Sequence, residues 1–227
     1  MSGNPMRLLI IGTTLALLTL AGCATAPIEP PAAPRIDAVP AQTPAGLSRT
    51  RAAVVRTAAK LVGTTTLQSN GRRIAYDCAG VTRAIFLEHG IDLYSGGTND
   101  PNANGVRLIF SHVRRHGTLH QDPVAHPGDL VFFDNTWDFN GDGRLNDPLT
   151  HVGVVERVDP DGTVTFISRV AESVERYRMN LALPHVHQTA DGRVLNNYIR
   201  RIHPSDPADM GHLTGELFTF YGTRLGQ

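Results

Sequence analysis

The sequence predicts an α+β domain in which N-terminal helices pack on an antiparallel β-sheet. Apolar residues recur at helical spacing between about residues 48 and 117. Beyond that point the apolar segments are short and rich in β-branched and aromatic residues, which is typical of strands. Residues 159–162 (DPDG) form a hairpin-turn signal between two of these segments. Helices followed by hairpin-linked strands are the element order of an α+β fold.

Three helices are predicted, over residues 48–63, 78–90 and 101–117. Ser48 can cap the first helix and Asp77 the second, because a side-chain oxygen at that position accepts from a free amide of the first turn. A glycine ends each pattern. The first and third helices carry apolar residues along one face, namely Val54, Val55, Ala58, Leu61 and Val62, and then Val106, Ile109, Phe110 and Val113.

Five segments are predicted to be strands because they are rich in β-branched and aromatic residues. They are residues 129–134 (DLVFFD), 151–158 (HVGVVERV), 163–169 (TVTFISR), 173–179 and 195–202. The last segment, residues 204–227, carries an LFTFY cluster without a recognisable pattern. We expect that segment to pack back on the domain.

The N-terminus resembles an export signal that ends in a lipid-attachment site. An apolar run over residues 8–20 follows a basic start and is too short for a comfortable membrane span. It ends in LAGC (residues 20–23), which resembles the lipobox of bacterial lipoproteins. We therefore predict a signal peptide over residues 1–22 and lipidation of Cys23, the alternative being an ordinary secretory signal cut nearby. Ala24 resembles an outer-membrane sorting signal, so we expect a lipid-anchored protein of the bacterial cell envelope, on the outer membrane and facing the periplasm.

Residues 23–47 are predicted to be a tether between the membrane and the domain. Six prolines among alanines exclude a helix or a central strand there. The globular domain is then expected over residues 48–227, which is the size of one ordinary domain. Basic and acidic residues balance at 21 each, so the charge gives no reason to expect a nucleic-acid partner.

Cys78 is the first candidate for a functional residue. The chain has two cysteines, and lipidation would use Cys23, which leaves Cys78 without a disulfide partner in an oxidising compartment. In the first turn of a helix capped by Asp77, the positive end of the helix dipole favours a thiolate, which is a nucleophile. The alternative is a free cysteine that is buried as a small apolar residue.

His151 is the candidate base for this nucleophile. A reactive thiol needs a base within hydrogen-bond reach and a third group that orients the base. His151 opens a strongly apolar predicted strand, where a polar ring is well placed to face a cleft. Gly153, two residues later, allows another part of the backbone to approach closely.

Three motifs, in this order, resemble those of the NlpC-type cell-wall cysteine peptidases. They are YDCAG at the start of a helix (residues 76–80), HPGDLVFF (126–133) and HVGVV (151–155). The resemblance covers about residues 48–169 and implies a papain-like α+β domain. It further implies that Cys78 attacks an amide and that His151 is its base, whereas the PGDL segment belongs to the scaffold.

The resemblance also implies a polar residue on the following strand that orients His151. The best match is Ser168, where the family more often has His, Asn or Gln. A serine hydroxyl can accept from an imidazole, but more weakly and with shorter reach. We therefore expect a cysteine hydrolase that cleaves amide bonds of peptidoglycan stem peptides through a thioester on Cys78, without an organic cofactor. The alternative is a catalytically weak or inactive lipoprotein of the same fold that binds peptidoglycan.

Residues 138–147 (DFNGDGRLND) match the first half of a calcium-binding loop. Carboxylate or amide oxygens alternate along it, and a glycine occupies the sixth position. An EF-hand would need Glu where this chain has Leu149, so the pattern is closer to the short calcium loops of extracellular proteins. A structural Ca²⁺ here would stiffen the approach to His151, the alternative being a surface turn without an ion. The predicted ligands are Asp138, Asn140, Asp142, the carbonyl of Arg144, Asn146 and Asp147.

Overall fold

The fold is described from a computed structural model that covers residues 48–67, 74–204 and 206–226. The predicted signal peptide, Cys23 and the tether lie outside these residues. In chain order, the elements are α1 (Arg49–Leu61), α2 (Cys78–Leu87), α3 (Gly105–His116), β1 (Thr118–His120), β2 (Leu130–Phe133), β3 (His151–Val158), β4 (Val164–Arg169), β5 (Val174–Met179), α4 (Thr214–Leu217) and β6 (Phe218–Thr223). A membrane-crossing helix needs a longer apolar stretch than any helix in the described ranges provides.

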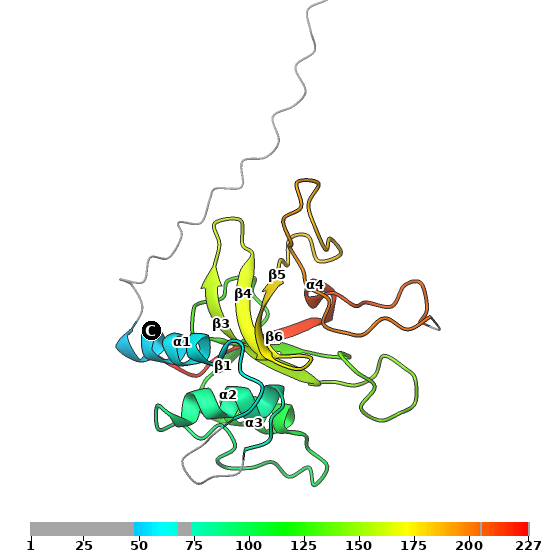
Figure 1. Ribbon diagram of the computed structural model, residues 1–227. Coiled ribbons are helices and arrows are strands. Elements are labelled where there is room, and N and C mark those ends of the chain that lie inside the picture. The colour runs from blue at the N-terminus through cyan, green and yellow to red at the C-terminus, as the bar shows by residue number, and fades with distance from the viewer. Residues whose placement is uncertain (1–47, 68–73, 205, 227) are drawn as a thin grey trace, which may run out of the picture. The chain divides into compact units, whose positions relative to one another are not determined.

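The six strands form one antiparallel sheet in the order β1-β6-β2-β3-β4-β5. The helices α1 and α2 pack against β3, and α3 packs against β1 and β6 (Figure 1). The prediction of an α+β domain, with N-terminal helices on an antiparallel sheet, is therefore confirmed.

The three N-terminal helices begin at side-chain caps, as two of them were predicted to do. Ser48 Oγ accepts from the amide of Arg51 at 3.3 Å, and Asp77 Oδ1 accepts from the amide of Gly80 at 2.7 Å. The third helix starts at Gly105, capped by Asn104, instead of at residue 101 as predicted. Asn104 is a favourable N-cap, because its side chain accepts from a first-turn amide while its own backbone is extended. The residues before it therefore stay outside the helix.

Both faces of the sheet are buried, and alternate residues of a strand enter two different cores. In β2, Leu130 and Phe132 pack into the helix-side core with Ile85 of α2. Val131 and Phe133 face the other way. The second core is covered by the chain after β5, whose contributions include Leu181, Ile199, Leu217 and Phe218.

The prediction that residues 195–202 form a strand is wrong. The segment runs beside the edge strand β5, but asparagine side chains, in place of backbone carbonyls, accept several of the hydrogen bonds from the backbone there. Asn197 Oδ1 accepts from the amide of Arg178 at 2.7 Å, and Asn196 Oδ1 accepts from the amide of Asn180 at 2.8 Å. Asparagine side chains compete in this way with regular backbone pairing.

Residues 204–227 do more than pack back on the domain. They supply α4 and then β6, which inserts between β1 and β2. Thr118 pairs with Thr223 on one side of β6, and Val131 pairs with Tyr221 on the other. The end of the described chain therefore forms an inner strand of the sheet, one place from its edge.

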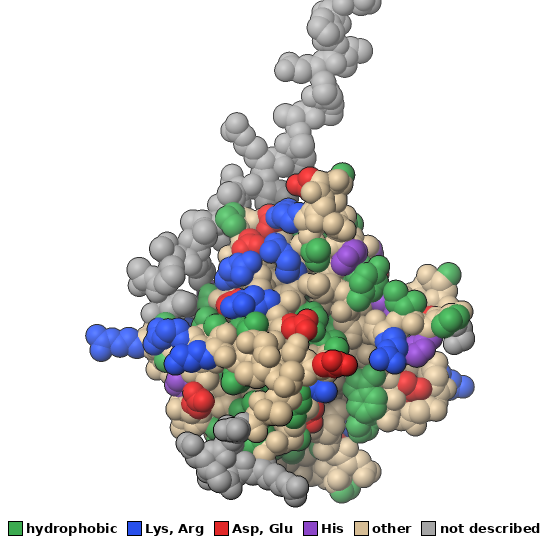
Figure 2. Space-filling view, in the orientation of Figure 1, with side chains coloured by type: hydrophobic (Ala, Val, Ile, Leu, Met, Phe, Trp, Pro, Cys, Tyr) green, Lys and Arg blue, Asp and Glu red, His purple; other side chains and the backbone are tan. Residues whose placement is uncertain are grey.

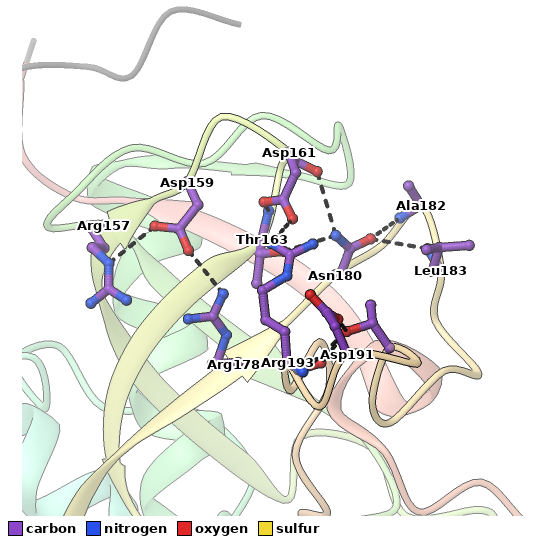
Figure 3. A network of polar contacts seen from close by, with 11 residues as sticks. Arg157, Asp159, Asp161, Thr163, Arg178, Asn180, Ala182, Leu183, Asp191 and Arg193 are labelled. Atoms are coloured by element: carbon purple, nitrogen blue, oxygen red, sulfur yellow. Dashed lines mark hydrogen bonds and ion pairs between the residues drawn. The ribbon is translucent and has the colours of Figure 1, made fainter. Parts of the chain in front are cut away.

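The predicted turn between β3 and β4 is confirmed, and it anchors the segment that follows β5. Gly162 donates to Asp159 O at 2.9 Å and has a φ of +79°, a conformation that favours glycine. Asp159 forms ion pairs with Arg157 and Arg178 (Figure 3). Arg193, from the loop after β5, pairs with Asp161 in the same turn. These contacts hold the loop against the far end of the hairpin.

Asp129 ties the two ends of the described domain together. Its side chain is fully buried and accepts from Arg51 Nη1 at 2.9 Å, from the amide of His126 at 2.8 Å and from Thr223 Oγ1 at 3.0 Å. Arg51 also donates to Leu225 O at 2.8 Å. Such a network is consistent with the scaffold role that the resemblance implies for the PGDL segment.

Candidate active site

Cys78 is the first residue of α2 and lies at the floor of a cleft. The Asp77 cap fixes the start of the helix, and the preceding chain crosses over the third helical residue, Gly80. A Cβ at Gly80 would lie 1.9 Å from the carbonyl oxygen of Ala75, so only glycine permits this crossing. The segment before the helix is thereby held close to the thiol.

His151 is the first residue of β3 and is 6 % exposed. It pairs in the sheet with Phe133 of β2, and the two rings lie 6.0 Å apart. Gly153 makes room for the neighbouring strand, because a Cβ there would lie 2.6 Å from the Phe166 ring and 3.1 Å from the backbone oxygen of Ile167. The predicted close approach at Gly153 is therefore present.

Ser168 lies on β4 and is fully buried beside His151. Its Oγ lies 2.9 Å from His151 Nε2 and 2.7 Å from Val152 O. The hydroxyl of Ser168 has one hydrogen to donate, and the carbonyl of Val152 can only accept a hydrogen bond, so this hydrogen goes to Val152 O. Ser168 Oγ must then accept from His151, which places the proton of the neutral ring on Nε2 and leaves Nδ1 free to take a proton.

One cleft contains both candidate catalytic groups. It has a volume of about 620 Å³ and is lined by Cys78 and His151 together with the start of α3, the end of β4 and residues 136–137 and 198–201. Among the described residues, the ring of His151 is hydrogen-bonded to Ser168 and not to the thiol of Cys78. Catalytic hydrogen bonds are often longer in a protein without substrate than in its complex.

The thiol and the ring are both neutral in this state. Burial raises the pKa of Cys78 to about 12, and the charge of Asp77 acts in the same direction. Hydrogen bonding from the amides of Val152, Ala79 and Cys78 opposes this rise in pKa without offsetting it. Burial also lowers the pKa of His151 to about 3.

At Cys78, burial in the cleft therefore outweighs the helix dipole in the state without substrate. A helix terminus supplies partial charges worth about 0.3–1 kcal/mol at exposed positions, whereas desolvation of an ionised group costs several times more. The proton of Cys78 must instead move when a substrate fills the cleft.

The pH dependence of alkylation tests the resting state. In a Cys23→Ser chain, Cys78 is the one remaining thiol. Because its pKa is raised to about 12, the thiolate fraction grows about tenfold per pH unit over the whole neutral range. The rate constant for iodoacetamide, followed by mass, is expected to rise about tenfold per unit between roughly pH 6 and pH 10. A rate that is constant above mildly acid pH would instead show a preformed thiolate–imidazolium pair.

The predicted calcium loop has most of its oxygens bonded to its own groups. Asp138 accepts from the amides of Gly141 and Gly143, both at 2.8 Å, and Asn146 Nδ2 donates to Asp142 Oδ2 at 2.8 Å. In the described ranges, no three His, Cys, Asp or Glu side chains form a group that could hold a metal ion.

Asp147 is the exception in this loop. It is 2 % exposed, and its Oδ1 accepts from the amide of Asn140 at 3.2 Å. Its Oδ2 is buried and has no hydrogen-bond partner among the described residues. A buried carboxylate oxygen without a partner is costly and marks a place where a cation would fit.

Five residues of the cleft were not singled out from the sequence: Trp137, Arg169, Tyr198, Arg200 and Arg201. They come from the loop after β2, the end of β4 and the segment beside β5. No local pattern marks them, because they reach the cleft from three separate segments of the chain. Tyr198, Arg200 and Arg201 lie in the segment wrongly predicted to be a strand.

Comparison with known proteins finds similarity among solved structures. No family model matches the chain, and no curated protein matches it. Among solved structures, the chain is similar to the NlpC/p60 domain of the peptidoglycan hydrolase SagA, with 27 % sequence identity and a TM-score of 0.33. The match covers 56 % of this chain and 86 % of that chain. We therefore base the functional inference on the site itself.

Proposed function

We propose that the protein is a cysteine hydrolase that cleaves an amide bond of peptidoglycan stem peptides through a thioester on Cys78. The observation that carries this proposal is the placement of Cys78 and His151 in one cleft, with Ser168 at 2.9 Å from His151 Nε2. That contact leaves His151 Nδ1 as the free acceptor. The choice of peptidoglycan is supported by the motif resemblance to NlpC-type peptidases and by the predicted export signal.

The reaction begins with proton transfer from Cys78 Sγ to His151 Nδ1. The sulfur then attacks the carbonyl carbon of the amide, and the carbonyl oxygen takes up the negative charge. Collapse of this intermediate breaks the C–N bond, and the imidazolium gives its proton to the leaving amine. Water, deprotonated by His151, attacks the thioester and releases the acid and the free thiol.

Ser168 and the backbone near Cys78 support these steps. Ser168 accepts from Nε2 and so stabilises the imidazolium that forms when His151 takes the proton. The amides of Ala79 and Cys78 stabilise negative charge at the sulfur, and amides in this position can also meet the oxyanion. The helix N-terminus thus acts on the transition state, where charge develops, although it does not ionise the resting thiol.

A non-catalytic peptidoglycan-binding role is the second candidate. The observation that favours it is the neutral resting pair, with the pKa of Cys78 raised to about 12. Both candidates use the same cleft and predict that peptidoglycan binds. They differ in whether covalent products appear.

Digestion of purified peptidoglycan by the full-length protein tests the proposal, with soluble products identified by mass. New termini within the stem peptide would show an endopeptidase, and release of the whole peptide from the sugar would show an amidase. An acceptor amine attached to the acyl fragment would show a transferase. Binding to the insoluble material without any released fragment would favour the non-catalytic candidate.

We also propose that Cys23 is lipidated and anchors the protein in the cell envelope. The support is the LAGC sequence at residues 20–23 and the proline-rich segment that follows it. Metabolic labelling with a fatty acid, compared with a Cys23→Ser chain, tests the anchor. Equal labelling of both chains would contradict it.

A structural calcium ion in the loop of residues 138–147 is a further part of the proposal. Two observations support it. The Oδ2 atom of buried Asp147 has no hydrogen-bond partner among the described residues, and Asp or Asn residues alternate along the loop at positions 138, 140 and 142. The loop leads directly into β3. The amide of Thr150, the residue before His151, donates to Phe133 O at 3.0 Å and so joins the end of the loop to β2. An ion there would order the approach to the base without taking part in the chemistry.

Chelation tests the calcium proposal. A ligand at about a hundred times its Kd stabilises the fold by about 2.7 kcal/mol, which is about 5–10 °C in Tm for a domain of this size. Treatment with EGTA is expected to lower the Tm by this amount, and readdition of Ca²⁺ to restore it. The matched control is Asp147→Asn, which should show no response to EGTA. An unchanged Tm and unchanged activity of the wild type after chelation would contradict the site.

A further inference from the structure

The cleft that holds Cys78 and His151 has an excess of positive charge. Arg169, Arg200 and Arg201 line it, and the one acidic residue among its described lining residues is Asp77. The carboxylate of Asp77 already caps α2. On the face shown in Figure 2, by contrast, acidic and basic side chains are interspersed.

The three cleft arginines lack carboxylate partners in the part of the chain that the structure describes. Elsewhere, guanidinium groups pair closely, as Arg83 does with Asp92 at 2.8 Å and Arg176 with Glu156 at 2.7 Å. Arg200, in contrast, donates to the backbone oxygen of Asn135 at 2.6 Å. Arg169 lies over the ring of Tyr76, with its guanidinium carbon 5.0 Å from the ring centroid.

Two of these arginines carry buried donors without partners. Arg200 is 9 % exposed, and the Nε atoms of both Arg200 and Arg169 are buried and have no hydrogen-bond partner among the described residues. A buried guanidinium that lacks a counter-charge is costly. Its cost falls when an anion enters the cleft and accepts its hydrogen bonds.

We infer that the substrate carries a carboxylate close to the scissile amide, and that Arg169, Arg200 and Arg201 recognise it. This inference rests on the proposed function. A guanidinium presents a planar fork that matches a carboxylate, and the stacking of Arg169 on Tyr76 holds that fork in place. Arg169 and His151 line the same cleft, so the carboxylate binds close to the base. It belongs either to an acidic side chain or to a free C-terminus of the peptide.

Matched synthetic stem peptides test the inference. In one series the side-chain carboxylate is free or amidated, and in the other the terminal carboxylate is free or amidated. The wild-type chain is expected to cleave the free form of one series about 10- to 100-fold more efficiently in kcat/KM, the value of a charged hydrogen bond. The series that shows the preference identifies which carboxylate is bound.

Arginine variants assign the preference to this site. Arg169→Gln and Arg201→Gln are each expected to reduce the ratio of kcat/KM for the free and amidated peptides to within about threefold. The matched control is Arg157→Gln, which lies outside the cleft in the β3–β4 hairpin and pairs with Asp159. It should keep the wild-type ratio. Equal cleavage of free and amidated peptides by the wild type, or an unchanged ratio in both cleft variants, would overturn the inference.

Failure of catalysis is separated from failure of recognition by a binding measurement. Calorimetry with Cys78→Ala reports the Kd of the same peptides without turnover. If no peptide is cleaved but the free carboxylate binds about tenfold more tightly, the hydrolase proposal fails and the recognition inference stands. If the free and amidated forms bind equally, the recognition inference is wrong whatever the enzyme does.

Discussion

Cys78→Ala is expected to release no soluble fragments from purified peptidoglycan, a loss of at least about 10⁴-fold in rate. Alanine has no nucleophile, and the described cleft residues offer no second thiol to replace it. His151 cannot take over, because its ring is fixed by Ser168 and serves as the base. The measurement is the yield of soluble peptides by mass spectrometry after digestion by equal amounts of the two chains.

The fold of this variant serves as its control. Cys78 is half-buried, so loss of one sulfur should cost about 1 kcal/mol of stability, and the melting curve should stay close to that of the wild type. The wild type should also carry a transient acyl mass on Cys78 that the variant lacks. Fragment release at the wild-type rate by a folded Cys78→Ala chain would exclude the thioester mechanism.

Substitution of Ser168 is expected to reduce activity less than substitution of Cys78. Ser168→Ala would leave the Nε2–H of His151 buried without an acceptor, a cost of about 1–3 kcal/mol. We expect activity to fall about 10- to 100-fold and not to vanish, because Cys78 and His151 both remain. A partial loss of activity in Ser168→Ala and a complete loss in Cys78→Ala would distinguish the residue that orients the base from the nucleophile.

The elements that could be predicted from the sequence are those specified by neighbouring residues. Asp77 caps α2 because its oxygen reaches an amide three residues ahead, and the turn at residues 159–162 forms from its own four residues. The strand over residues 151–158 matches its prediction at both ends. In the cap and the turn, the deciding contacts lie within a few residues of one another, and the strand is indicated by the β-branched residues of its own segment.

The features that could not be predicted depend on contacts between distant parts of the chain. The last strand, β6, inserts between β1 and β2, where Thr223 pairs with Thr118, and no local pattern specifies that partner. The pKa of Cys78 is raised mainly by its burial in the folded domain, and the helix dipole that the sequence indicates does not reflect this burial. The arginines of the cleft likewise gather from β4 and from the segment beside β5.

Asp129→Ala is expected to cause the largest loss of stability of any single change considered, about 3–5 kcal/mol. The change leaves the guanidinium of Arg51, which is 3 % exposed, without its counter-charge. It also removes the acceptor of Thr223 Oγ1 at the end of β6. Urea unfolding followed by circular dichroism measures the effect, and the Tm should fall by about 10 °C or more.

An exposed ion pair provides the matched control. Asp159→Ala removes contacts with Arg157 and Arg178, but these groups lie partly in solvent, so the expected loss is below about 1 kcal/mol. The double variant Arg51→Met/Asp129→Leu should recover most of the loss, because the cost of Asp129→Ala comes from a stranded charge and not from missing attraction. If Asp129→Ala costs no more than Asp159→Ala, the buried pair does not hold α1 to the end of the sheet. The N-terminal helix would then owe its position mainly to its apolar contacts, among them those of Val54 and Ala58.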